Sequence, residues 1–247
     1  MIDFGQVFEE RLQEIESYLD LLDEFDRQVQ EGPPRFGKEG NSVSVLQQQI
    51  LYSSVYLQLY NLVEATISLC IDGLSEAILA MKLHPKDLTA KLRREWVRST
   101  ARTHIDLNYE GRLNSAVALC DHFVQTLPIS TFVVDKTGGG SWDDAAIERA
   151  AKRLGLAFRV DSEVYTSVKR PFRNDQGALS FIKTLRNSLA HGSVSFAECG
   201  RGITVGDLRH LKDLTVGYLR EVISCFQAAI SGYEFLVPER RPQGASE

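Results

Sequence analysis

The stretch ILYSSVYLQLYNLVEATISLCI, residues 50–71, decides the fold because it is apolar on nearly every side. Polar residues interrupt it at Gln58, Asn61 and Glu64, so it does not have the composition of a membrane-spanning helix. A helix that is apolar all round is buried by its neighbours. The stretch therefore predicts a core helix at the centre of a helical bundle, and we expect no contact with a membrane.

The ends of this core helix can be read from the flanking residues. Ser42 or Ser44 can cap its N-terminus, and His84-Pro85 stops it, since the residue before a proline avoids the helical conformation. The predicted helix therefore runs to about Leu83.

A second long helix is predicted before it, within residues 1–31. Its apolar residues recur at steps of three and four and form one stripe, namely Phe4, Phe8, Leu12, Ile15, Leu19, Leu22, Phe25 and Val29. Ten acidic side chains and two arginines occupy the remaining positions of this segment. The turn-rich residues 32–41 separate it from the core helix, so we expect it to pack on the bundle as an amphipathic helix.

The rest of the chain also reads mainly as helix, and the class is all-α with long antiparallel helices. The main helical domain is expected over residues 42–236, with a small irregular insertion at 128–172 and a disordered tail at 237–247. The predicted helices span about 88–102, 112–126, 142–154 (capped by Ser141), 174–191 and 207–235. TFVV at 131–134 fits a short strand, and the alternation after Gly192 predicts a short β-hairpin leading into the last helix.

Composition indicates an ordinary globular protein. The 247 residues are 43% hydrophobic and 25% charged, with a net charge of −5. The four cysteines lie far apart with no CxxC pair, as expected for reduced thiols. The N-terminus does not read as a secretory signal, so we expect a cytoplasmic protein.

The most interpretable chemistry lies in FIKTLRNSLAHGSVSF, residues 181–196. Asn187 and His191 are four residues apart and share one face of a predicted helix that stops at Gly192. An imidazole exchanges protons near neutral pH, and a guanidinium such as Arg186 can hold a phosphate and its developing charge. These groups suit RNA cleavage without a metal, but a plain structural role of His191 as a cation at a helix C-terminus stays open from these residues alone.

The run RNSLAHG resembles the signature of the HEPN superfamily, whose RNase members carry arginine, a polar residue, three further residues and histidine. LQLYNLVEATISLCIDGL (57–74) and HGSVSFAECGRGITVGDLRHLKD (191–213) are similar to one bacterial group of HEPN-like nucleases of toxin–antitoxin and defence loci. The similarity covers most of residues 1–236.

This resemblance implies a HEPN-type helical bundle and an endoribonuclease with Arg186 and His191 as catalytic residues and Asn187 in support. It also implies a homodimer with a composite site between subunits, an RNA substrate, no metal or other cofactor, and an antitoxin or defence-system partner protein. Glu64 is a weaker candidate, since an acid on the corresponding helix occurs in many members. In members inactivated by nucleotidylation a tyrosine stands two residues after the histidine, and this chain has Ser193 there, which argues against that regulation.

A basic segment offers candidate RNA-binding residues. Residues 82–102 hold seven Lys and Arg against two acids, and the cations we expect to guide an RNA backbone are Lys91, Arg93, Arg94 and Arg98. Two other readings stay open for the chain: a non-catalytic HEPN module that binds nucleotide or RNA or scaffolds a partner, and a DNA-binding regulator that uses the basic helix.

Overall fold

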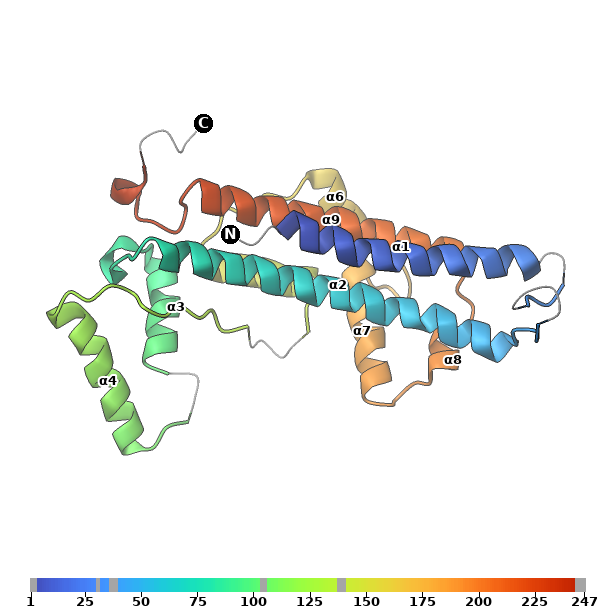
Figure 1. Cartoon of the computed structure of the whole chain (residues 1–247), viewed down its shortest axis with the longest axis horizontal. Coiled ribbons are helices and arrows are strands. Elements are labelled where there is room, and N and C mark those ends of the chain that lie inside the picture. Colours follow the sequence, from blue (N-terminus) through green and yellow to red (C-terminus); the bar gives the residue numbers. More distant parts are fainter. Residues whose placement is uncertain (1–3, 30–31, 36–39, 103–105, 137–140, 243–247) are drawn as a thin grey trace.

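The computed structural model describes residues 4–29, 32–35, 40–102, 106–136 and 141–242, and this part of the chain is all-α, as predicted. Its β-type pairings are isolated bridges. Long helices α1, α2 and α9 lie side by side, and shorter helices pack around them (Figure 1). The helices are α1 Phe4–Val29, α2 Val45–Ala80, α3 Ala90–Thr100, α4 Tyr109–Val124, α5 Asp144–Leu154, α6 Ser162–Lys169, α7 Ala178–Ala190, α8 Phe196–Cys199 and α9 Val205–Ser231.

Helix α2 forms the centre of the bundle. Ser44 caps it in a reciprocal capping box with Gln47, which satisfies amide donors that the first turn leaves unpaired. Its buried side chains lie on several sides, and α1, α7, α8 and α9 pack against it. The apolar stretch at 50–71 is therefore the core helix that its composition predicts.

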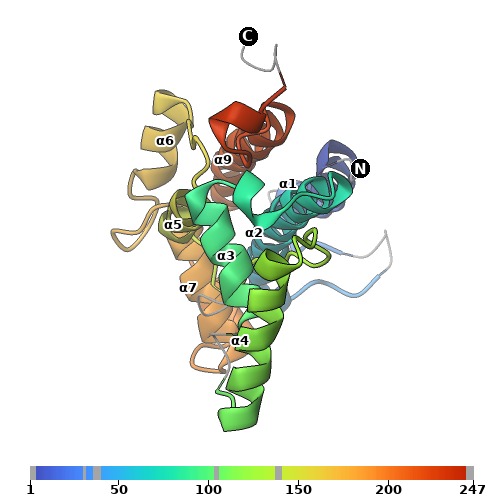
Figure 2. The same ribbon diagram turned by 90° about the vertical axis from the view of Figure 1, so that its left-hand side faces the viewer.

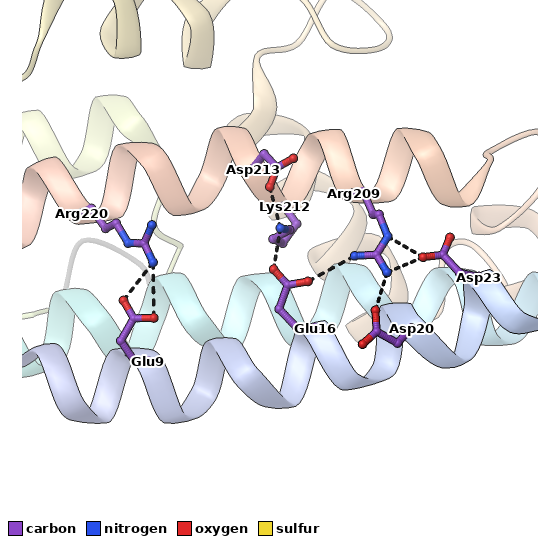
Figure 3. Close-up of polar contacts among 8 residues, drawn as sticks. All are labelled: Glu9, Glu16, Asp20, Asp23, Arg209, Lys212, Asp213 and Arg220. Carbon is purple, nitrogen blue, oxygen red and sulfur yellow. Dashed lines mark hydrogen bonds and ion pairs between the residues drawn. The ribbon is translucent and has the colours of Figure 1, made fainter.

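Helix α1 buries the predicted stripe from Phe4 to Phe25, whereas Val29 at its end is exposed. Its acidic face lies along α9, and the two helices run antiparallel (Figure 3). Ion pairs join them at three points of α9, namely Arg209, Lys212 and Arg220. Several of the acidic side chains of α1 are therefore paired with cations of α9.

Helix α7 ends where the sequence predicts, with His191 as its C-cap residue and Gly192 at a φ of +67°. A left-handed φ after a helix favours glycine. The β-hairpin expected next is wrong. Ser195 and Glu198 form a capping box, and this pair of hydrogen bonds starts the one-turn helix α8 in place of a strand.

The segment 128–172 carries α5 and α6, of which α6 was not expected. Helix α5 begins two residues later than predicted, because Asp143, and not Ser141, caps it by accepting a hydrogen bond from the amide of Ala146. Residues 131–134 form no strand. The glycine triplet at 138–140 lies outside the described residues.

Helices α3 and α4 extend from the end of the bundle (Figure 2), and α4 packs on α3.

Beyond α9, the tail that composition predicts to be disordered begins with a 3-10 turn, Pro238–Arg240. There Arg240 donates to Asp87 at 2.9 Å, so a charged hydrogen bond orders residues that composition alone suggests are mobile. Residues 243–247 of this tail lie outside the described residues. In the described residues, none of the helices has the length and apolar character needed to cross a bilayer.

Candidate functional site

The predicted motif lies at the C-terminal end of α7. Arg186 and Asn187 are half-buried in the last turn, and His191 is exposed just past it. Leu189 is buried and holds the apolar face of this turn against the core. The three polar side chains therefore lie at the junction between packed helix and solvent.

The Arg186 side chain points back onto α2. Its Cζ lies 4.4 Å from the ring centroid of Tyr60, and its Nη2 lies 3.8 Å from Oε2 of Glu64. Its Nη1 donates to Oδ1 of Asn187 at 3.0 Å. Ring, carboxylate and amide together fix the guanidinium, whose side chain remains 32% exposed. The structure thus places Glu64 within ion-pair distance of the motif arginine.

Asn187 connects the motif to the segment before α5. While its Oδ1 accepts from Arg186, its Nδ2 donates to Oγ of Ser141 at 3.2 Å. The backbone amide of Trp142 donates to the Tyr60 hydroxyl at 3.2 Å. The segment before α5 is therefore attached to both α7 and α2 at the motif.

An ion pair between Lys183 of α7 and Asp143 reinforces this attachment. Burial by itself raises the pKa of Asp143, but the hydrogen bonds from Lys183 and from the Ala146 amide outweigh burial, and the pKa lies below its ordinary value. Asp143 is therefore ionised at neutral pH and caps α5 while holding it on α7.

Sequence reasoning missed Tyr60, Ser141 and Lys183 as neighbours of the motif. Tyr60 reads as core packing, and it is buried. No local pattern links Ser141 to Asn187, since 46 positions separate them. The available signal was the position of Ser141 just before a predicted helix, and this position marks it only as a cap.

His191 differs from its neighbours in the motif. Its ring has no hydrogen bond and no ion pair with another described residue, and the side chain is exposed. Within one chain, no hydrogen bond joins the described side chains of His191 and Arg186. An exposed imidazole at a helix C-terminus is accessible to a substrate or a second protein chain.

Of the predicted basic residues, Arg93 points away from the others. Its guanidinium donates to the backbone carbonyls of Pro85, Lys86 and Leu88, where it closes the turn before α3. This arrangement gives Arg93 a structural role, and its contact with RNA stays a prediction.

Lys91, Arg94 and Arg98 lie together along a hollow between α3 and α5. Lys91 and Arg94 are exposed, and Arg98 is half-buried beside the buried carboxylate of Glu95 at 3.2 Å. The structure therefore brings three of the four predicted cations to one concave surface.

Among the described residues, no group of three or more His, Cys, Asp and Glu side chains is placed to hold a metal ion. The cysteines there are free thiols, and burial raises the pKa of Cys70 to about 12.

A family model described as MAE_28990-like HEPN matches residues 5–235, which is nearly the whole chain. Comparison with curated proteins and with solved structures gave no significant match. The match includes α7 with its motif and the core helix α2 that contacts it. The chain therefore belongs to the MAE_28990-like HEPN family.

Proposed function

We propose that the protein is a metal-independent endoribonuclease whose site forms between two copies of the chain. Family membership supports this proposal, and so does the arrangement of the motif at the end of α7. The observation that carries it is a guanidinium fixed on three sides yet still partly exposed, at the same helix end as an exposed imidazole.

The chemistry follows from the groups present. An imidazole of His191 takes the proton of a ribose 2′-hydroxyl, and the 2′-oxygen forms a bond to the adjacent phosphorus. The bond from phosphorus to the 5′-oxygen breaks, and that oxygen takes a proton from a second imidazole. The products are a 2′,3′-cyclic phosphate and a 5′-hydroxyl end, and general acid–base help of this kind contributes about 10²–10⁴-fold.

Arg186 would hold the negative charge that develops on the phosphorane oxygens, and its fixed position means that little reorganisation is needed. Asn187 and Glu64 act as positioning residues, since both contact the guanidinium directly. The two required imidazoles support a homodimer, because each chain supplies one His191 and a two-fold axis can bring two copies together.

Cleavage of a synthetic RNA in the presence of EDTA tests this proposal. The wild type is expected to produce 2′,3′-cyclic phosphate ends, and His191→Ala is expected to lose the activity while its melting temperature stays near that of the wild type. His210→Ala is the matched control, because His210 is also exposed but lies on α9, outside the motif. Absence of cleavage by the wild type, or equal cleavage by His191→Ala, would contradict the proposal.

The second candidate is a non-catalytic HEPN module that binds nucleotide or RNA or scaffolds a partner. The contacts of Arg186 with α2 favour it, because they also stabilise the fold. In that case Arg186→Ala lowers the melting temperature, and no cleavage is measured for any variant.

The setting we propose is a cytoplasmic toxin–antitoxin or anti-phage defence system with a partner protein that restrains the nuclease. Expression of the wild type without such a partner is then expected to slow bacterial growth, and expression of His191→Ala is not. Equal growth of the two strains at equal protein levels would contradict this setting.

A further inference from the structure

A hollow of about 370 Å³ lies between α3 and α5, and its charge is almost entirely positive. Three of its cations come from α3 and three from α5, with one acid between them. The lining residues are Lys91, Arg94, Glu95, Arg98, Arg149, Lys152 and Arg153. The α5 half of this basic groove belongs to the segment 128–172.

The single acid, Glu95, pairs with two arginines of the basic groove and leaves its charge positive. Glu95 is 2% exposed, and its Oε1 lies 3.2 Å from Arg98 and 3.7 Å from Arg153. One buried carboxylate therefore holds a guanidinium from each helix on facing sides of the groove.

Four cations of the basic groove form no close ion pair, although Arg149 lies near enough to Asp143 to help lower the pKa of that carboxyl. Lys91, Arg94, Arg149 and Lys152 are exposed, and none of them forms an ion pair with a carboxylate in the described part of the chain. Lys91 donates instead to the backbone carbonyl of Lys152 at 2.9 Å, which joins the two helices without cancelling charge. Unpaired cations on concave protein surface attract polyanions and concentrate them locally.

The basic groove continues toward the nuclease motif. An adjoining hollow of about 250 Å³ shares Arg149 and Arg153 with it and reaches Ser141. The Ser141 hydroxyl accepts the hydrogen bond from Asn187. The charged residues that line this second hollow are Lys136, Arg149 and Arg153 and one acid, Asp135. A mainly basic surface thus leads from the hydrogen-bond network of Arg186 to the groove between α3 and α5.

We propose that this surface binds the sugar–phosphate backbone of single-stranded RNA on one side of the scissile phosphate. The inference rests on the proposed nuclease function and extends it to the substrate. No aromatic side chain lines the basic groove itself within the described residues, and Trp142 in the adjoining hollow is buried, so phosphates, and not stacked bases, are the groups this surface is suited to hold. In-line attack by a 2′-hydroxyl also needs a backbone free of the A-form helix, which favours single strands.

The surface fits an RNA chain better than an acidic protein because it is continuous with the motif that we propose cuts RNA. It also gives the segment 128–172 a function, since α5 supplies half of the cations. The groove is expected to increase affinity for long RNA with little dependence on base sequence.

The test is fluorescence anisotropy with a labelled single-stranded RNA of about 16 nucleotides. Binding is measured in the full-length His191→Ala chain, so that cleavage does not interfere. The double change Arg149→Glu and Lys152→Glu is expected to weaken binding by about tenfold or more and to lower the slope of log affinity against log salt by about 1 to 2. Arg11→Glu with Arg27→Glu makes the same charge change on exposed residues of α1 and is expected to alter affinity by less than about threefold.

An equal loss in both double variants, or no loss in either, would overturn the inference. Competition by a polyglutamate peptide as strong as that by unlabelled RNA would also overturn it, in favour of an acidic protein partner. With His191 restored, the α5 double variant is expected to cut long RNA more slowly than the wild type, and the variant with Arg11→Glu and Arg27→Glu is expected to cut it at the wild-type rate. A wild type that cuts nothing, combined with binding lost only in the α5 variant, would sink the nuclease proposal and leave the groove as an RNA site.

Discussion

The guanidinium of Arg186 lies over the aromatic ring of Tyr60, with 4.4 Å between Cζ and the ring centroid. This contact joins the motif helix α7 to the central helix α2, and Glu64 adds a carboxylate one helical turn further along α2. The ring lies against the centre of the cation, and nitrogens of the guanidinium contact Asn187 and Glu64.

Arg186→Lys is expected to lower the cleavage rate of the proposed nuclease by about 10²–10³-fold, although the positive charge is kept. A lysine offers neither the flat face that stacks on Tyr60 nor two parallel donors for phosphate oxygens. Single-turnover cleavage of a labelled RNA gives the rate. Arg112→Lys on α4, where the arginine is 70% exposed, is the control and should cut as fast as the wild type. A lysine variant with the full rate would mean that charge alone suffices.

Asp143 makes the stability of the fold depend on pH, because its contacts with Lys183 and the Ala146 amide lower its pKa. Because its pKa is lower in the folded chain than the ordinary value of about 3.8, it stabilises the fold above that value. This contribution disappears as the pH falls through the folded pKa. Asp143→Ala is expected to lower the free energy of unfolding by about 1–3 kcal/mol at pH 7, since it removes a helix cap and leaves Lys183 without its partner.

Urea unfolding between about pH 7 and 2 measures this effect. The difference between wild type and Asp143→Ala should shrink as the pH is lowered below about 4. Asp106→Ala is the control, because that carboxylate is 98% exposed, and it should stay within about 0.5 kcal/mol of the wild type. A constant difference across the pH range would show that the ionised form of Asp143 contributes nothing.

Arg209 is the centre of the ion pairs between α1 and α9, because it contacts Glu16, Asp20 and Asp23 at once (Figure 3). Arg209→Ala leaves neighbouring carboxylates without this cation and should destabilise the chain by about 1–2 kcal/mol at low salt, and by less at high salt. Arg220→Ala removes an exposed pair with Glu9 and should cost less than about 1 kcal/mol. Thermal unfolding at two salt concentrations compares them, and equal effects would show that the network adds nothing beyond single pairs.

The sequence predicts those parts of the fold that depend on local pattern. The stripe on α1, the capped core helix α2 and the end of α7 at Gly192 follow from helical periodicity and end signals, and the structure confirms them. The alternation after Gly192 predicts strands, but the capping box of Ser195 and Glu198 makes this region the helix α8. Over so few residues, the alternation was a weaker signal than the cap.

Local sequence patterns do not predict contacts between positions far apart in the chain. Nothing near Lys183 in the sequence predicts its pairing with Asp143 40 positions away, and nothing near Glu95 predicts that it holds an arginine of α5. The basic segment was recognised by composition, but the direction of each side chain depends on packing. For that reason composition places Arg93 with Lys91, Arg94 and Arg98, although its side chain binds the turn before α3 and does not line their hollow.

Gly200 at the end of α8 and Gly217 within α9 differ in the space that an added Cβ would find. A Cβ at Gly200 would lie 1.9 Å from the backbone oxygen of Gln49, whereas a Cβ at Gly217 meets nothing within 4 Å. Gly200→Ala must push α8 away from α2 and is expected to destabilise the chain by about 1–3 kcal/mol. Gly217→Ala lies inside α9 and should stabilise it by about 0.5–1 kcal/mol. Urea unfolding measures both, and a neutral Gly200→Ala would show that α8 can shift freely.

The exposed position of the His191 ring makes it possible to search for the natural targets of the proposed nuclease. Since the ring is exposed and forms no hydrogen bond or ion pair with another described residue, its removal should leave the surrounding protein surface as it is. A chain altered only there could be expressed in bacteria, crosslinked to the transcripts that it holds and purified with them. Sequencing the captured molecules would then identify the RNAs that the proposed nuclease cuts.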